Sequence, residues 1–416
     1  MTCRGRVTPT QNNYLLLPST FQQVHLNDAS LLKRARKFTP TNLFLTLSEL
    51  VCSTNNNGYT TAILKALSKE FGITELPSKS ALSQYRQTIS SEFFLDFMRD
   101  VNERSQNKRR TWKGLYVYAI DGISLTLPRS EDIMKAGYSG RKVSKYRESY
   151  MPKMFMTMSY DVINGTVKDL REGSAHREIH DANSMIEGFE DNSLTIYDRL
   201  YASRKLILKH HDSQNFFLFR LKEHLLREFS GILKSKRKRM TVTVDNVTVH
   251  LIKIRNPKNN EWMYFASNLP FGLVSEKTIS NLYRLRWEVE NGFRDFIQTI
   301  RLEQWHSKFI NGVRQELYVA TVLYNFVKLK ILSKFNTAKE CMKDTYQRPN
   351  FKLLFGFVTS KLFELIKGVR GAIKGFDELL YRSIETRTHY SRSYPREIKS
   401  PQSPFPYNNT RWYGLN

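Results

Sequence analysis

The feature that most constrains the fold is a series of short apolar runs, separated by helical patterns, between residues 114 and 221. Each run is rich in aromatic or β-branched residues and has the length of a strand, so we interpret each as a strand of a sheet. An Asn164-Gly165 pair is typical of a hairpin turn. The predicted strands are residues 115–120, 125–127, 154–162, 194–197 and 216–221.

Helical patterns lie between the later strands, at residues 181–189 and from Ser203 onward. Strands that alternate with helices in this way predict an α/β fold, with a mixed sheet flanked by helices. Residues 222–275 are again strand-like, with a turn at Asp245-Asn246, and we interpret them as a mainly β insertion. A long helical pattern resumes at Glu276 and runs through Arg301. Further helices are expected at residues 312–334 and 350–366.

The N-terminal part is predicted to be helical over residues 39–104. Residues 61–71 have apolar side chains at helical spacing, Gly72 suits a C-cap, and Ser78 suits the N-cap of a second helix. Such a pair resembles a helix-turn-helix, whose second helix would present Lys79, Ser80, Gln84 and Arg86 to DNA. The alternative is a helical hairpin that packs on the main core.

Three domains are therefore expected. Residues 1–110 form an N-terminal helical domain, residues 111–335 the α/β domain, and residues 336–416 a C-terminal helical region with a basic tail. Polar breaks at residues 55–58 and 102–110 mark boundaries, and the tail from Thr386 has the composition of a poorly ordered segment.

The charge balance points to a polyanionic partner. Lys and Arg number 65 against 39 Asp and Glu, a formal net charge of +26, and nucleic acid is the partner such a field favours. A membrane surface or a ribosome-associated role are the alternatives, although no amphipathic anchor is visible. The three cysteines are scattered, which excludes a disulfide framework and a zinc site. No signal peptide or membrane span is present, so we expect a cytoplasmic, nucleoid-associated protein.

Three acids occupy positions that suit a metal site. Asp121 and Asp198 each follow an apolar strand directly, and Glu290 lies within a helical pattern. A carboxylate at the end of a buried strand is costly unless it is paired or binds metal. Carboxylates that converge from two strand ends and a helix can hold two divalent cations for phosphoryl transfer. Taken singly, the acids could instead be a turn residue, a salt-bridge partner and a solvated helix residue.

Tyr283 and Arg286 precede Glu290 at spacings of three and four, which place the three side chains on one helix face. Here the chain resembles the DDE-type transposases of the bacterial insertion sequence four superfamily. Its signature is Tyr, two residues, Arg, three residues, Glu, six residues, Lys. The first acid matches in YAIDGISLTLP and the second in Asp198-Arg-Leu-Tyr201, and the similarity spans about residues 116–328.

This resemblance implies a ribonuclease H-like catalytic domain, with Asp121, Asp198 and Glu290 as catalytic residues that hold two Mg²⁺ ions, for which Mn²⁺ can substitute. It implies a dimer that binds the inverted repeats of an insertion sequence, cuts one strand with water, and joins the freed 3′-hydroxyl to other DNA. Two positions depart from the family pattern: Ile297 stands where the signature has Lys, and Leu200 where the second motif has Gly.

Further DNA contacts are expected from a basic run and from the signature helix. Trp287 is either a core anchor or a residue that stacks on a displaced base, and the segment from His176 to Glu178 is a candidate for the rim of the site. The phosphate-binding candidates are Tyr283, Arg286, Lys234, Lys236, Arg237, Lys238 and Arg239.

Three other functions fit part of the pattern. A DNA-binding protein without catalysis would explain the charge but not the acids. A nuclease that does not transfer strands would use the same metal site. An inactive transposase copy would explain Ile297.

Overall fold

The computed structural model describes residues 39–51, 58–105, 109–144, 147–222, 226–256, 260–335, 345–366 and 368–388. Cys3, Cys52, Cys341 and most of the C-terminal tail lie outside these ranges, so the predictions made for them are not tested. The chain divides into two compact units. The first comprises Met1–Asn107, Arg314–Val327 and Pro349–Ile384, and the second Lys108–Val313, Lys328–Arg348 and Glu385–Asn416.

The first unit is built from helices whose apolar faces are buried. The N-terminal and C-terminal helical segments belong to it together, along with the central part of α12. Its helices are α2 (Pro40–Val51), α3 (Tyr59–Phe71), α4 (Lys79–Thr88), α5 (Glu92–Arg104), α12 (Ile310–Lys334, in part), α14 (Phe351–Ser360), α15 (Leu362–Ile366) and α16 (Arg370–Arg382).

The expected helix pair is present in this unit as α3 and α4. Gly72 ends α3 with a φ of 72°, a conformation that favours glycine. The Ser78 side chain accepts a hydrogen bond of 3.1 Å from the backbone N–H of Ala81 and so caps α4. Leu82 is buried, whereas Lys79 is exposed at the start of the helix. Both expected helices and their caps are therefore present, whereas a DNA-binding helix-turn-helix role for the pair stays a prediction.

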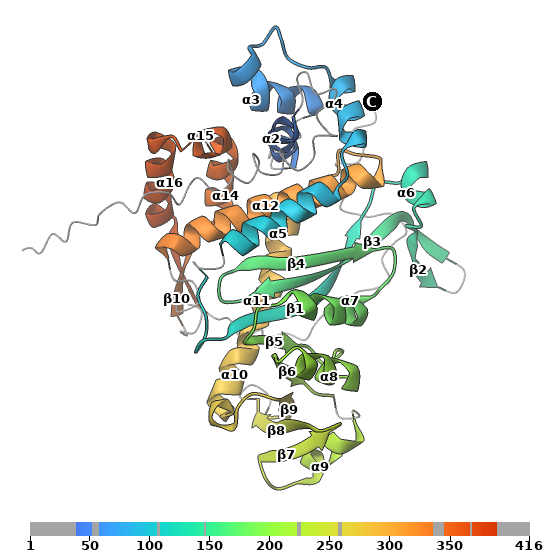
Figure 1. The fold of residues 1–416 in the computed structure, drawn as a ribbon, viewed down its shortest axis with the longest axis vertical. Coiled ribbons are helices and arrows are strands. Elements are labelled where there is room, and N and C mark those ends of the chain that lie inside the picture. The colour runs from blue at the N-terminus through green and yellow to red at the C-terminus, as the bar shows by residue number, and fades with distance from the viewer. Residues whose placement is uncertain are drawn as a thin grey trace, which may run out of the picture. The chain divides into compact units, whose positions relative to one another are not determined.

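The second unit contains a mixed sheet, in which β3 pairs antiparallel with both β1 and β4, while β1, β5 and β6 are parallel neighbours. This confirms the predicted mixed sheet flanked by helices (Figure 1). The strands described are β1 (Tyr116–Thr126), β2 (Gly140–Ser144), β3 (Arg147–Asp161), β4 (Thr166–Gly173), β5 (Ser193–Tyr197), β6 (Phe216–Arg220), β7 (Arg239–Val244), β8 (Val247–Arg255) and β9 (Trp262–Ser267). A separate pair is formed by β10 (Thr345–Pro349) and β11 (Ile384–Thr388).

The β-rich insertion continues this sheet and does not form a separate layer. β7 and β8 form a hairpin whose turn residues, Asp245 and Asn246, have φ values of 46° and 69°. Two successive positive φ values are typical of a tight hairpin turn, and Asp and Asn tolerate them. β9 pairs antiparallel with both β8 and β6, so the edge of the α/β core extends directly into the insertion.

The helix expected from Glu276 through Arg301 is interrupted, so this prediction was wrong in part. α10 ends at Leu285, α11 begins at Trp287, and residues 295–300 form a π-helical turn. Arg301 then adopts a φ of 60°, which ends the helix. The other helical elements of this unit are α6 (Glu131–Lys135), α7 (Glu178–Met185), α8 (Arg204–Asp212), α9 (Ser230–Lys234), α10 (Glu276–Leu285), α11 (Trp287–Arg294), and short 3₁₀ turns at Ile186–Gly188, Arg227–Phe229 and Phe271–Leu273.

α7 and α11 cover opposite faces of the central strands (Figure 1). The Thr157 hydroxyl on β3 donates to Asp181 of α7. The next residue, Met158, lies under Gly292 of α11, where an added Cβ would come within 3.4 Å of its methyl group. Successive side chains of a strand point to opposite faces, so the two helices sandwich β3 between them.

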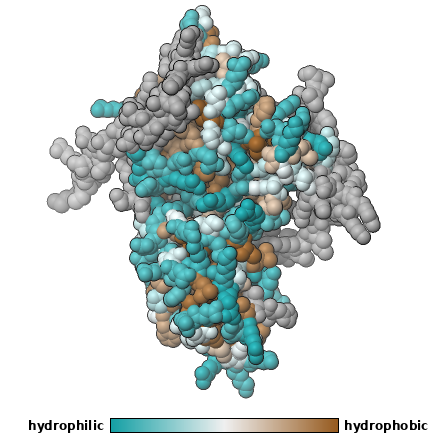
Figure 2. All heavy atoms as spheres, turned by 45° about the vertical axis from the view of Figure 1, so that its right-hand side comes forward, coloured by the Kyte–Doolittle hydropathy of each residue, from teal (hydrophilic) through white to brown (hydrophobic). Residues whose placement is uncertain are grey.

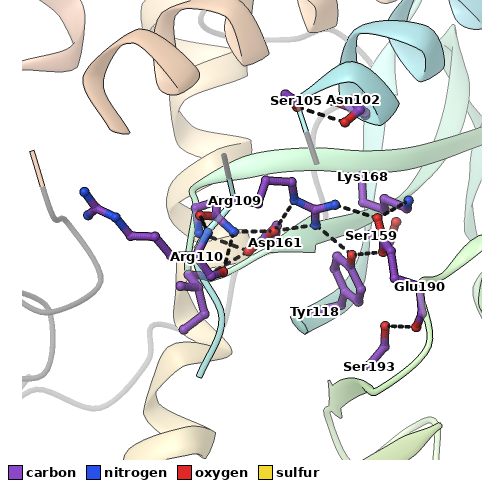
Figure 3. Close-up of polar contacts among 12 residues, drawn as sticks. Asn102, Ser105, Arg109, Arg110, Tyr118, Ser159, Asp161, Lys168, Glu190 and Ser193 are labelled. Carbon is purple, nitrogen blue, oxygen red and sulfur yellow. Dashed lines mark hydrogen bonds and ion pairs between the residues drawn. The ribbon is translucent and has the colours of Figure 1, made fainter. Parts of the chain in front are cut away.

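A buried ionic cluster fixes the entry of the chain into the sheet (Figure 3). Arg109 donates to Asp161 at 2.9 Å and to Glu190 at 2.7 Å, and Tyr118 and Lys168 also donate to Glu190. Asp161 is fully buried. Burial alone would raise the pKa of Glu190, but Arg109 and Lys168 lower it to about 2. The cluster therefore ties the segment before β1 to β3 and β4 through charged groups that are all paired.

Apolar side chains are concentrated inside the two units. In the face seen in Figure 2, hydrophilic residues predominate and apolar areas are interrupted by them. None of the helices in the described ranges combines the length and the apolar character that a bilayer crossing needs.

Candidate active site

Asp121 and Asp198 emerge at the same end of two adjacent parallel strands. The pairing of β1 with β5 runs from Tyr116 opposite Ser193 to Ala119 opposite Ile196. Asp198 follows the last residue of β5, and Asp121 lies just beyond the paired part of β1. The strands run the same way, so both carboxylates reach the same edge of the sheet, as expected from the sequence.

Glu290 is brought to this edge by α11. Val289 and Phe293 of this helix are buried. Gly292 lets the helix approach β3 closely, since an added Cβ would lie 3.0 Å from the ring of Tyr160. Glu290 follows the buried Val289 on α11, and its side chain is 31% exposed.

Two residues of the signature connect the three acids. Arg286 donates from Nη2 to Glu290 Oε1 at 2.7 Å and from Nη1 to Asp121 Oδ2 at 3.3 Å. The Tyr283 hydroxyl donates to Asp198 Oδ1 at 3.3 Å. The Arg286 guanidinium carbon also lies 5.9 Å from the centre of the Tyr283 ring, a cation–π distance. One network of contacts therefore includes all five residues.

The electrostatics of the site favour an additional cation. Burial, together with the smaller effects of the nearby Glu178 and Glu290, raises the pKa of Asp121 to about 6 against the opposing effects of Arg286 and the Gly122 N–H. Burial likewise raises the pKa of Tyr283. A carboxyl group with a raised pKa is one whose charged form lacks compensation, and a metal cation can supply it.

The donor set suits a divalent metal, although its side chains are arranged around a guanidinium. Carboxylate oxygens are the ligands that Mg²⁺ prefers. Within the residues that the structure describes, no three His, Cys, Asp or Glu side chains are grouped closely enough to hold an ion. The Arg286 guanidinium bridges Asp121 and Glu290 here and is their counter-charge. The oxygen ligands of the three acids therefore suit a divalent cation, and Arg286 competes with such a cation for Asp121 and Glu290.

Arg86 must be removed from the predicted DNA contacts. Its side chain is 4% exposed and forms an ion pair of 2.8 Å with Glu316, which is 2% exposed. It also donates to Gln315 and to the Tyr59 hydroxyl. Its position on α4 gave no sign of this, because the two partners on α12 lie about 230 residues away in the sequence. Arg86 therefore stabilises the first unit from inside.

Of the other predicted contacts, Arg286 is 7% exposed, whereas the basic run of the insertion lies where solvent can reach it. Lys234 ends α9 and Arg239 begins β7, and every basic side chain of the run between them is exposed: Lys234, Lys236, Arg237, Lys238 and Arg239. Lys238 forms an ion pair of 3.1 Å with Glu276. Trp287 is 41% exposed, with the Arg286 guanidinium 5.7 Å from its ring. Ile297 lies in the π-helical turn that follows α11.

Two residues that sequence reasoning did not single out also lie beside the site, Arg220 against Tyr283 and Tyr201 against Glu178. The Arg220 guanidinium carbon, from the end of β6, lies 5.8 Å from the centre of the Tyr283 ring. The Tyr201 hydroxyl donates to Glu178 at 3.3 Å. Tyr201 belongs to the motif Asp198-Arg-Leu-Tyr201, and Arg220 lies within residues 116–328, over which the resemblance extends.

Comparison with known proteins assigns the chain to a family. A family model described as Transposase DDE domain matches residues 112–326, which is more than half of the chain. The chain belongs to the transposase DDE domain family. The matched residues include all three acids, Tyr283 and Arg286, and the whole β insertion.

Two curated relatives from Escherichia coli strain K12 carry transposase names. The Transposase InsG for insertion sequence element IS4 is 22% identical over 353 residues, which cover 79% of this chain and 78% of that protein. The protein named Putative transposase InsZ is 27% identical over 143 residues, but the match covers 32% of this chain and 46% of InsZ. The chain thus spans less than half of InsZ and most of InsG.

A solved structure, a piggyBac transposase synaptic complex with hairpin DNA, aligns with 88% of this chain and 84% of its own. The TM-score is 0.42 and the sequence identity 12%.

Proposed function

We propose that the chain cuts and joins DNA at the ends of an insertion sequence, with Asp121, Asp198 and Glu290 as the catalytic carboxylates. The observation that carries this proposal is the single network in which Arg286 contacts Asp121 and Glu290 while Tyr283 contacts Asp198. Acids distant in the sequence meet at one edge of the sheet, which is what phosphodiester chemistry requires.

In this mechanism Asp121, Asp198 and Glu290 would hold divalent cations, Mg²⁺ or, as a substitute, Mn²⁺. Two such ions would supply the activation of an attacking water and the stabilisation of the leaving oxygen. No protein nucleophile is needed, because water and then a DNA 3′-hydroxyl attack the phosphorus.

Arg286 and Tyr283 position the DNA. A guanidinium binds a phosphate through two parallel hydrogen bonds, and Arg286 lies directly beside two of the acids. The Tyr283 hydroxyl, which here donates to Asp198, can donate equally to a phosphate oxygen. Trp287 is exposed next to Arg286 and offers a ring on which a displaced base can stack.

Exposed basic side chains in each of the two units supply further phosphate contacts. Lys79 on α4, together with Lys234, Lys236, Arg237, Lys238 and Arg239 in the insertion, contacts phosphates of the element end and of the target. The protein acts as a homodimer that holds both ends, in the bacterial cytoplasm where the chromosome is.

A strand-transfer assay tests this proposal. Purified protein, Mg²⁺ and DNA that carries the element end are incubated with a plasmid target. We expect end cleavage followed by joined products, and we expect Asp121→Asn to abolish both. Cleavage without joined products would indicate a nuclease that lacks strand transfer.

The position of Ile297 gives a second candidate, an inactive copy of such a transposase. The signature places Lys there, and Ile297 cannot contact a phosphate through charge. If wild-type protein binds element-end DNA but neither cuts nor joins it, and Ile297→Lys restores cleavage, the chain is an inactive copy.

A further inference from the structure

The Glu178 side chain lies directly against Gly122, the residue that follows Asp121. A Cβ placed on Gly122 would overlap the carboxyl group of Glu178. Only glycine lets a carboxylate approach the backbone of β1 this closely at that position. The Gly122 backbone does not have a positive φ, so the effect of a larger residue here would be to displace the Glu178 carboxyl group and not to strain the backbone.

The first turn of α7 is fixed in this place by a second contact. Asp181 lies three residues after Glu178 and therefore on the same face of the helix. It accepts a hydrogen bond of 2.9 Å from the Thr157 hydroxyl. Thr157 is the direct cross-strand partner of Gly122 in the pairing of β1 with β3. The hydrogen bond of Asp181 with Thr157 and the pairing of Thr157 with Gly122 therefore hold Glu178 against β1.

The same carboxyl group is connected to the segment that bears the second acid. The Tyr201 hydroxyl donates to Glu178 Oε2 at 3.3 Å. Tyr201 is 1% exposed, and its backbone N–H donates to the carbonyl of Asp198. Glu178 thus touches residue 122, next to the first acid, and Tyr201, in the turn that begins with the second.

No Lys or Arg in the described ranges pairs with Glu178. Its closest basic group is Nδ1 of His176, at 3.9 Å from Oε1. The Gly122 backbone N–H, beside the Glu178 carboxyl group, donates to Asp121 Oδ1 at 3.0 Å, and the guanidinium of Arg286 is bound to Asp121 and Glu290. The Glu178 side chain is 27% exposed, so an ion from solvent can reach it.

We propose that Glu178 is a fourth carboxylate of the metal site and holds a divalent cation together with Asp121. This inference rests on the proposed function and extends it, since the family signature and the sequence interpretation assign three acids only. The Glu178 carboxylate adds an oxygen ligand and a negative charge next to Asp121, and Tyr201 orients it.

The test is the binding of Mn²⁺ to the full-length protein without DNA, followed through the electron paramagnetic resonance signal of the free ion. The variants are Asp121→Asn, Glu178→Gln and, as a matched control, Glu187→Gln. Glu187 is an exposed acid on a 3₁₀ turn, paired with Lys209, so the control removes the same charge elsewhere. We expect Glu178→Gln to weaken Mn²⁺ binding about 10-fold, Asp121→Asn to weaken it at least as much, and Glu187→Gln to leave it unchanged.

The outcomes separate this inference from the proposed function. If Asp121→Asn weakens binding while Glu178→Gln behaves like Glu187→Gln, the role of Glu178 is wrong and the three-acid site stands. If Asp121→Asn has no effect, or the wild type binds no Mn²⁺, both proposals fail.

A second variant keeps the inference testable if Glu178→Gln does not fold, as judged by circular dichroism. Gly122→Ala retains every acid but displaces the Glu178 carboxyl group, since the added Cβ would overlap it. We expect the same loss of Mn²⁺ affinity. Unchanged affinity in a folded Gly122→Ala protein would overturn the inference.

Discussion

Arg286 lies between Asp121 and Glu290 and donates to both carboxylates, at 3.3 and 2.7 Å. The guanidinium thus occupies the space between two acids that, in the proposed reaction, hold a metal. Arg286 is 7% exposed, so its charge is balanced by these two partners rather than by water. The acids and the arginine of the signature therefore depend on each other before any DNA arrives.

The first prediction concerns Arg286→Gln. Glutamine keeps polarity but loses the charge and the bidentate donors that suit a phosphate. We expect cleavage of element-end DNA to fall about 100-fold, a loss typical for removing one donor from a charged transition state. Arg382→Gln, an exposed arginine at the end of α16, is the control. Equal cleavage rates for the two variants in single-turnover assays would show that Arg286 has no part in the reaction.

The second prediction separates stability from DNA binding on α4. Arg86→Ala removes the buried ion pair of 2.8 Å with Glu316, and we expect the free energy of unfolding to fall by about 3–5 kcal/mol. Lys79→Ala removes an exposed charge at the start of the same helix. It should leave stability unchanged and weaken DNA binding. Denaturant melts measure the free energy of unfolding, and fluorescence anisotropy with labelled DNA measures affinity. If Arg86→Ala weakened DNA affinity without loss of stability, while Lys79→Ala left affinity unchanged, the roles assigned to the two residues would be wrong.

The third prediction is a dependence of stability on pH that arises from His210. This residue is fully buried on α8 and contacts the Tyr197 hydroxyl at 2.8 Å. Burial lowers its pKa from 6.5 to about 3. Between these values the unfolded chain binds a proton that the folded one does not, so stability falls as the pH drops below 6.5. The loss is about 1.4 kcal/mol per pH unit.

The variant His210→Phe should remove this contribution, and the slope of stability against pH between 4 and 6 is the quantity that reports it. His211→Phe is the control, since His211 is the exposed neighbour on the same helix. If the slope of stability against pH is as steep in His210→Phe as in His211→Phe, the pH dependence arises from other groups.

The fourth prediction concerns the basic run of the insertion. Each phosphate contact by a cation contributes about 0.9 to the slope of log affinity against log salt concentration. Replacing Lys236, Arg237 and Arg239 together by Gln should therefore reduce that slope by about 2.7. All three side chains are exposed. A slope identical to that of the wild type would mean that these charges are solvated and contact no DNA.

The elements that the sequence predicted correctly are those with a local cause. Asn164-Gly165 and Asp245-Asn246 favour turns through their own backbone preferences, and the apolar runs that precede Asp121 and Asp198 are buried strands. The adjacency of these two strands followed from their order in an α/β fold. For this reason, the meeting of Asp121 with Asp198 at one edge was predictable from the chain alone.

The features that were not predicted have long-range causes. The burial of Arg86 depends on Glu316, and the continuity of the insertion with the core depends on the pairing of β9 with β6. The break after Leu285 falls in a segment whose helical periodicity is unbroken, so no local pattern marks it. The contact of Glu178 with Gly122 likewise joins segments that are about 55 residues apart.

The most direct test of the account is a single-turnover cleavage assay on element-end DNA with Mg²⁺. It compares the wild type with Asp121→Asn, Asp198→Asn and Glu290→Gln, each shown to be folded by circular dichroism. The account predicts that the wild type cuts the end and leaves a 3′-hydroxyl, and that each of the three variants loses at least 1000-fold in rate, about 4 kcal/mol of barrier. Cleavage that survives at the wild-type rate in any one variant would contradict the assignment of that acid to the active site.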